Sequence, residues 1–181
     1  LLQGSPKQIT QSVMSREVDF AIATEVPEEA EGLVSIPAFE WEHVAIVPSK
    51  HPLAGQPLSL QALVKYPLVT YVEEFAGRRR IDRAFADAGL RPDVVLAAID
   101  SDVIKTYVKV GLGVGIMTGL AYDAAQDRGL VAMPAGGLFG MNYVRLAVRR
   151  DAFLRGFALS FIELFAPGVD RRTLERLMKH R

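Results

Sequence analysis

The sequence contains no cysteine, which excludes disulfide bonds, thiolate catalysis and zinc–thiolate sites together. It also lacks any unbroken apolar run of the roughly 20 residues that a membrane-spanning helix requires. The stretch from Leu1 to Ser5 has no charged segment followed by a long apolar one, so no signal peptide is visible. We therefore expect a cytoplasmic protein that does not contact a membrane.

An excess of positive charge is missing as well. Lysine and arginine number 21, aspartate and glutamate number 21, and the formal net charge is zero. A nucleic-acid-binding domain usually carries a basic excess, because neutralising phosphates supplies most of its affinity. We therefore do not expect this stretch of chain to touch DNA itself. Half of its 181 residues are hydrophobic, enough for the core of one domain or of two small lobes.

Apolar strand patterns alternate with helical patterns along the chain, which predicts an α/β fold with mostly parallel sheets. Strands are expected at 18–24, 33–37, 42–47, 67–71, 94–99, 114–117, 130–133 and 142–148. Helices are expected after a cap at Ser5, with Pro6 in first position, and over 60–65 (capped by Ser59), 78–89, 103–110, 120–126, 153–165 and 171–180. In such folds, ligands bind at the carboxyl ends of strands.

Thr24 ends the apolar strand "VDFAIAT" on a hydroxyl, at a carboxyl end. The residue is either a turn residue or a hydrogen-bond donor for a ligand. Position alone leaves both interpretations open.

Two further motifs have ordinary structural explanations. The glycines of "GLGVG" at 111–115 follow a helix and precede a strand, so they do not match a dinucleotide fingerprint, which needs strand, turn and helix in that order. In "DSDVIKTY", Asp100 or Ser101 can cap the helix that follows. The same helix start could also bind an anion, and both interpretations stay open.

Four arginines gather in "AGRRRIDRAF". Arg78 and Arg83 each have an aspartate four residues later, the spacing of paired charges on a solvated helix face. That explanation is favoured for Arg80 and Arg83, whereas Gly77 and Arg78, at the start of the helix, could line a cleft.

No catalytic constellation is present. Glu73 and Glu74 are adjacent in a loop, which does not by itself oppose two carboxylates for acid–base work. His43, His51 and His180 are scattered without metal-ligand spacing, and there is no G-x-S-x-G nucleophile motif. We expect no enzyme, no catalytic residue, no metal site and no cofactor.

The order of several motifs resembles the effector-binding domain of LysR-type transcriptional regulators, specifically the CysB-type branch that controls sulfur assimilation. The matching stretches run from about Gln3 to Pro167, which is nearly the whole chain. They are "QGSPKQI", "VDFAIAT", "EW", "HPLAG", "YPLVTY", "DVIKTYVKVGLGVGI" and "FLRGF…FIELFAP".

The resemblance implies a two-lobed fold of the periplasmic-binding-protein type 2, with a Rossmann-like sheet flanked by helices in each lobe and two crossover segments. Lobe I is expected over 1–42 and 142–181, and lobe II over 43–141. The effector would bind between them. The family's winged helix-turn-helix domain and the first strand and helix of lobe I are expected to be absent from this chain.

The resemblance also implies the effector-binding residues. Thr24 and Trp41 occupy family positions, and the full expected set is Ser5, Thr24, Trp41, Thr70, Ala76, Gly77, Arg78, Ser101 and Asp102. A threonine of the family is replaced by Ala76, and Glu73 and Glu74 add carboxylates nearby. Losing a hydroxyl donor and adding negative charge should weaken a bare dianion such as sulfate.

The expected effector is therefore small, anionic or zwitterionic and linked to sulfur: sulfate, thiosulfate, adenosine phosphosulfate or an acetylserine. The resemblance further implies self-association into dimers and tetramers. It implies promoter DNA as a partner through the absent N-terminal domain, and RNA polymerase as a partner of the full-length protein. A periplasmic solute-binding protein of a transporter is the alternative with the same fold, and a deaminase-like enzyme is a third hypothesis.

Overall fold

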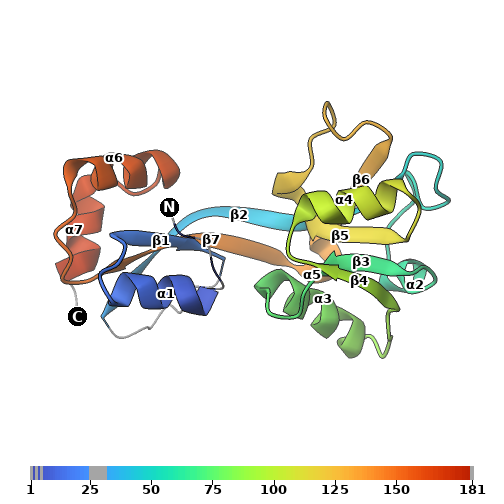
Figure 1. The fold of residues 1–181 in the computed structure, drawn as a ribbon, viewed down its shortest axis with the longest axis horizontal. Coiled ribbons are helices and arrows are strands. Elements are labelled where there is room, and N and C mark those ends of the chain that lie inside the picture. The colour runs from blue at the N-terminus through green and yellow to red at the C-terminus, as the bar shows by residue number, and fades with distance from the viewer. Residues whose placement is uncertain (1, 3, 5, 25–31, 180–181) are drawn as a thin grey trace. The chain divides into compact units, whose positions relative to one another are not determined.

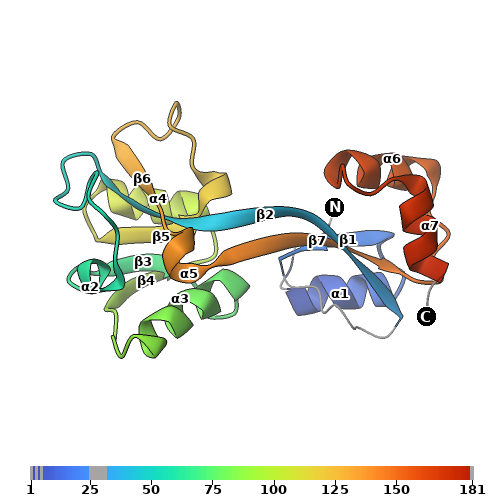
Figure 2. The same cartoon turned by 180° about the vertical axis from the view of Figure 1, so that it is seen from behind.

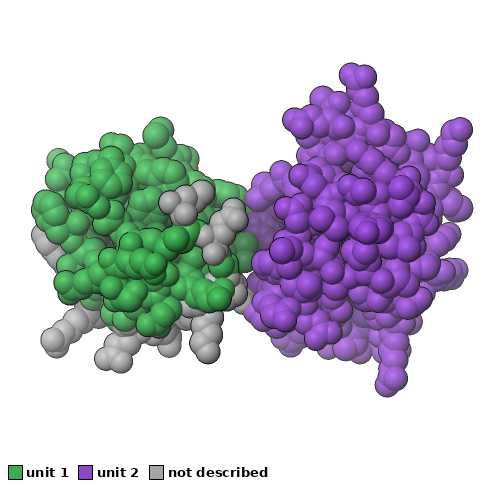
Figure 3. Space-filling view, viewed as in Figure 1, with its two compact units in different colours: residues 1–40, 143–181 green, residues 41–142 purple. Residues whose placement is uncertain are grey.

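The computed structural model describes Leu2, Gly4 and residues 6–24 and 32–179. The chain forms two compact units (Figure 3). Unit 1 comprises Leu1–Glu40 and Tyr143–Arg181, and unit 2 comprises Trp41–Asn142. Trp41, Glu42 and Asn142, which we expected in lobe I, belong to unit 2. Within it, a Glu42 carboxylate oxygen accepts from the N–H of Gly136 at 2.9 Å, and Asn142 Nδ2 lies 3.3 Å from His43 Nδ1.

Unit 1 is a small sheet with helices on both faces (Figure 1). Its elements are α1 (Pro6–Met14), β1 (Phe20–Ala23), the first part of β2 (Leu33–Pro48), the second part of β7 (Met141–Arg149), α6 (Gly156–Phe165) and α7 (Arg171–Lys179). Strand β7 pairs antiparallel with β1, from Phe20 opposite Val148 to Ala23 opposite Arg145.

Alternation along β7 decides which helix covers which face of unit 1. Leu146 and Val148 point into a core shared with α6 and α7, whereas Ala147 points into a second core with Val13 of α1. The predicted cap at Ser5 lies outside the described residues, but the helix begins at Pro6 as expected.

Unit 2 is a five-stranded mixed sheet with helices on both faces. Its elements after β2 are α2 (Leu60–Leu63), β3 (Leu68–Tyr71), α3 (Ala76–Asp87), β4 (Val94–Ala98), α4 (Ser101–Lys109), β5 (Val114–Thr118), the 3-10 turn η1 (Gly119–Ala121), β6 (Leu130–Pro134), α5 (Gly136–Phe139) and the start of β7. The strands lie in the order β2-β5-β3-β4, and β6 pairs with β2.

The α/β fold is confirmed, but the prediction of mostly parallel sheets was wrong. The strands joined through α3 and α4 are parallel: β3 with β4, and β3 with β5. Strand β2 is antiparallel to both β5 and β6. Helical crossovers produce parallel neighbours, and the other connections here return the chain in the opposite direction.

Helices cover both faces of the unit 2 sheet (Figures 1 and 2), and each face has its own core. Leu63, Phe85 and Phe139 bring α2, α3 and α5 onto one face. Ile104 and Val108 of α4 cover the other. The predicted cap of α2 is confirmed, since Ser59 Oγ accepts from the N–H of Ala62 at 3.1 Å.

Two local predictions were wrong, and one short helix was missed. The strands expected at 33–37 and 42–47 are one continuous strand, β2. The helix expected over 120–126 is only the turn η1, because carboxylates of Asp123 and Asp127 accept from backbone N–H groups there and hold a loop. The four-residue helix α5 was not predicted.

Among the described residues, no helix combines the length and the apolar character that crossing a membrane demands.

Candidate functional site

The carboxyl ends of β3 and β4 form one edge of the unit 2 sheet. The two strands are parallel, with Tyr71 opposite Ala98, and the N–H of Val72 donates to the carbonyl of Ala98 at 3.1 Å. Helix α3 begins soon after β3, at Ala76, and α4 soon after β4, at Ser101. Two helix N-termini thus follow two adjacent strand ends, an arrangement that favours binding of an anion. We call this region the carboxyl edge.

The Tyr71 hydroxyl links two elements at the carboxyl edge by hydrogen bonds. Tyr71 accepts a hydrogen bond from the N–H of Thr118 at 3.1 Å, and its oxygen lies 2.7 Å from Ser101 Oγ. Burial raises the pKa of the Tyr71 hydroxyl, so it stays protonated. Tyr71 has one hydrogen to donate, and donating it to Ser101 leaves the hydrogen of the half-buried Ser101 hydroxyl available to a ligand.

The first turn of α3 offers backbone donors. Phe75 precedes the helix without a side-chain cap, and its carbonyl accepts from the N–H groups of Arg78 at 3.1 Å and Arg79 at 3.3 Å. In the part of the chain that the structure describes, no backbone carbonyl accepts from the N–H of Ala76 or Gly77. These two donors can bind an oxyanion.

Arg78 anchors this turn to the sheet. Its buried guanidinium donates through Nη1 to the carbonyl of Tyr71 at 2.7 Å and through Nε to Asp82 at 2.8 Å. Glu73, largely exposed, lies 3.9 Å from the same group. The expected ligand contact of Arg78 stays a prediction. What the geometry provides is a rigid link between the end of β3 and α3.

Trp41 and His43 lie directly under Gly77. A Cβ atom at Gly77 would be 2.8 Å from His43 Nε2 and 3.3 Å from Trp41 Cη2, so only glycine fits without displacement. The rings of Trp41 and His43 meet edge to face at 4.9 Å. Burial, with the charge of Arg80 second, lowers the pKa of His43 from 6.5 to about 4, so the imidazole is neutral near pH 7.

Two other predicted residues have their polar groups occupied. The hydroxyl of the fully buried Thr70 donates to the carbonyl of Ile116 at 2.8 Å and ties β3 to β5. The Asp102 carboxylate lies 2.8 Å from Lys105 Nζ, and its N–H donates to the capping carboxylate of Asp100 at 2.6 Å. The capping interpretation of "DSDVIKTY" is thus confirmed for Asp100.

The remaining predicted residues belong to unit 1. Thr24 directly follows β1 and is half-buried. Ser5 lies outside the described residues. The structure therefore gathers seven of the expected residues in unit 2, namely Trp41, Thr70, Ala76, Gly77, Arg78, Ser101 and Asp102, around α3, α4 and the strands beneath them.

Sequence reasoning missed Tyr71 and His43. A signal existed for His43, because Trp41 and His43 are two residues apart on a strand and so point to the same face. Tyr71 closes the "YPLVTY" strand, and only the folded structure reveals its contact with Ser101. The described residues contain no group of three or more histidine, aspartate or glutamate side chains that could hold a metal ion.

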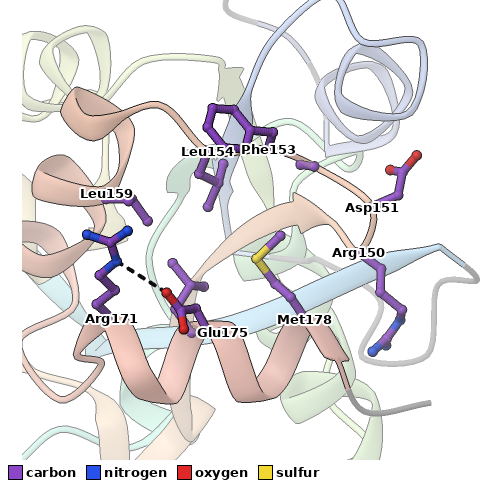
Figure 4. Close-up of a pocket in the computed structure, with 10 residues that line it drawn as sticks. Arg150, Asp151, Phe153, Leu154, Leu159, Arg171, Glu175 and Met178 are labelled. Carbon is purple, nitrogen blue, oxygen red and sulfur yellow. Dashed lines mark hydrogen bonds and ion pairs between the residues drawn. The ribbon is translucent and has the colours of Figure 1, made fainter.

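Unit 1 contains a separate cavity of about 320 Å³ (Figure 4). The turn after β7 and helices α6 and α7 line it, with Leu154, Leu159 and Met178 as apolar walls and the Arg171–Glu175 ion pair, 3.2 Å apart, on α7. None of the predicted effector-binding residues lines this cavity.

Comparison with known proteins gives a consistent result. The model of the LysR substrate binding domain family matches residues 1–169. The chain is 48% identical over 180 residues to the HTH-type transcriptional regulator CysB of Burkholderia cenocepacia and 39% identical over 177 residues to the regulator cbl of Escherichia coli. These alignments cover 99% and 97% of this chain, but only 58% and 56% of the two regulators.

Solved structures agree. The cofactor-binding domain of the Cbl transcriptional regulator superimposes with a TM-score of 0.91 at 38% identity, over 99% of this chain and 80% of that one. Resemblance therefore extends through both units of the chain, while the chain spans a little over half the length of its curated relatives.

Proposed function

Since the chain belongs to the family of LysR substrate-binding domains, we propose that it senses a small effector for a transcriptional regulator of sulfur assimilation, as the resemblance to the CysB-type branch implies. The relatives compared above are transcriptional regulators, which favours this function over a transporter's solute-binding protein or a deaminase-like enzyme. The proposal covers binding only and requires no bond to be made or broken.

The carboxyl edge of unit 2 is the proposed binding surface. The donors it offers are the N–H groups of Ala76 and Gly77 and the Ser101 hydroxyl, which shares a hydrogen bond with Tyr71; all three are uncharged. Neutral donors at helix starts hold an oxyanion without burying a full countercharge. The single observation that carries the proposal is that two backbone N–H groups without a backbone acceptor and one hydroxyl lie at two adjacent strand ends.

The charges beside the edge support a zwitterionic effector. Glu73 and Glu74 are exposed just before α3. A carboxylate of the effector would bind the first turn of α3, and an ammonium group would be attracted to these two side chains. An acetylserine with a free amine fits this pattern better than sulfate, which carries two negative charges and no positive one.

Thr24 and Trp41 are proposed to contribute to the same recognition. The resemblance implies an effector-binding role for both, for Thr24 as a hydroxyl donor and for Trp41 through its indole. Trp41 already lies under Gly77, whereas the role of Thr24 in unit 1 stays a prediction.

Regulation would follow from differential binding. An effector that binds one conformation or oligomeric arrangement more tightly shifts the population toward it. In the whole protein, we propose that this shift acts on dimers or tetramers and reaches promoter DNA through a winged helix-turn-helix domain, with RNA polymerase as a further partner. Such a regulator would work in the cytoplasm.

Thermal unfolding with a panel of compounds tests the proposal: sulfate, thiosulfate, adenosine phosphosulfate, O-acetylserine and N-acetylserine. A compound at 100 times its dissociation constant adds about 2.7 kcal/mol of stability, which is visible as a higher midpoint. We expect Ser101→Ala and Thr24→Ala to reduce the shift. Thr106→Ala, which removes an exposed hydroxyl later in α4, should leave it unchanged.

The proposal fails if no compound raises the midpoint. It also fails in its choice of site if Ser101→Ala and Thr106→Ala respond identically.

A further inference from the structure

His43 is a buried imidazole with a close neighbour on each side. Its ring meets Trp41 at 4.9 Å and Phe139 at 5.6 Å, both edge to face. Above the Nε2 atom lies Gly77, close enough that a Cβ there would sit at 2.8 Å. The first turn of α3 therefore lies close beside the imidazole, and the aromatic rings leave the imidazole little room to move.

The opposite nitrogen of the ring points to another element. Asn142 Nδ2 lies 3.3 Å from His43 Nδ1, and Asn142 is itself buried. An amide nitrogen can only donate, so Nδ1 accepts and the neutral ring carries its hydrogen on Nε2, the side of Gly77. Within the described residues, Nε2 has no hydrogen-bond partner.

The contact between His43 and Asn142 joins the two strands that connect the units. His43 lies on β2 and Asn142 on β7, and it is within these two strands that the chain passes from unit 1 to unit 2 and back. The His43 ring thus lies beside α3 at Gly77. It belongs to β2 through its own backbone and contacts β7 through Asn142.

We infer that His43 is a positioning residue of the effector site, which couples the first turn of α3 to the connecting strands β2 and β7. The inference rests on the proposed function. An anion bound to the N–H groups of Ala76 and Gly77 would hold this turn in one place. Because the space between Gly77 and Nε2 is too small for even a Cβ atom, a shift of the turn toward the ring would displace the ring and, through Nδ1, the start of β7.

The first experiment needs no effector. Amide hydrogen exchange of the chain is measured by mass spectrometry in the wild type, Asn142→Ala, His43→Gln and the double variant. Asn142→Ala should accelerate exchange about threefold in the segment 76–80, because the ring loses its support. The same change made in the His43→Gln background should add nothing.

Two controls test whether the effect is specific to the contact between His43 and Asn142. The segment 101–109 in α4 should exchange at the wild-type rate in every variant, and Ser59→Ala, which removes the cap of α2, should leave 76–80 unaffected. If Asn142→Ala does not fold, Asn142→Leu removes the same hydrogen bond with a side chain of similar size. Unchanged exchange at 76–80, or acceleration that persists without His43, overturns the inference.

The second experiment adds sulfate or O-acetylserine as the probe. In the wild type, the probe should slow exchange at both 76–80 and 141–149. In His43→Gln it should still protect 76–80 but no longer protect 141–149. Equal protection of both segments in the two proteins overturns the inference and leaves the proposed function standing. If neither probe protects 76–80 in the wild type, the proposed function fails for that probe, and the first experiment still decides the role of His43.

Discussion

Lys105 Nζ lies 3.2 Å from Asp127 Oδ1, and this pair fastens α4 to the loop that follows η1. The Lys105 ammonium also donates to the carbonyl of Ala121 at 3.0 Å, and Asp127 accepts from the N–H of Asp123 at 3.0 Å. Side-chain exposure is only 13% for Lys105 and 5% for Asp127. The pair holds in place the helix that presents Ser101 at the carboxyl edge.

Asp127→Ala is expected to lower the free energy of unfolding by about 3 kcal/mol, because it leaves the ammonium of Lys105 buried with less compensation. Urea unfolding monitored by circular dichroism measures the change. The matched control is Glu175→Ala, which removes the Arg171–Glu175 pair. With side chains 66% and 53% exposed, this pair should contribute less than about 1 kcal/mol. Similar losses for the two variants would contradict the assignment.

The lowered pKa of His43 predicts that the free energy of unfolding depends on pH. The pKa of about 4 in the folded chain lies below the ordinary 6.5, so the unfolded chain binds the proton more tightly. The stability that the neutral ring provides is complete above pH 6.5 and is lost as the pH falls toward 4, by on the order of 3 kcal/mol. Urea unfolding between pH 4 and 7.5 should show this loss. His43→Gln should flatten the curve, whereas the half-buried His51→Gln should change it less.

Gly77→Ala should destabilise the chain by about 1–3 kcal/mol and weaken effector binding, because the added Cβ would meet His43 Nε2 at 2.8 Å. Gly137→Ala is the comparison, since nothing lies within 4 Å of a Cβ at that position. It should be neutral or slightly stabilising. Thermal midpoints with and without effector check both effects, and a neutral Gly77→Ala would show that the first turn of α3 does not depend on this contact.

Tyr71→Phe should cost about 1–2 kcal/mol and reduce the midpoint shift caused by an effector. The substitution leaves the N–H of Thr118 without its acceptor and removes the partner that orients Ser101. Tyr122→Phe removes a hydroxyl that donates to the carbonyl of Leu130 at 3.2 Å and not to Ser101. It should lower stability without changing the effector shift. The comparison separates loss of a hydrogen bond from loss of the site.

Much of the local structure could be predicted from the sequence. Ser59 caps α2 and Asp100 caps α4, and glycines follow α3 and α4 at positions 89 and 111, both with positive φ. These features depend on residues within one helical turn of each other, so short patterns carry the information. The predicted helix over 120–126 failed because the carboxylate of Asp127 accepts from the backbone of Asp123 and pairs with Lys105 on α4, a contact from outside the segment.

The sequence by itself determined the family, through motifs in a fixed order, and the positions of most helices and strands. Only the tertiary structure decided that Tyr71 meets Ser101 across 30 positions, that His43 meets Asn142 across 99, and that a Cβ at Gly77 would come within 2.8 Å of His43. The tertiary structure also decided that β2 pairs antiparallel with β5 and β6. Strand order and side-chain contact are set by packing between segments far apart in the chain, and no short pattern contains that information.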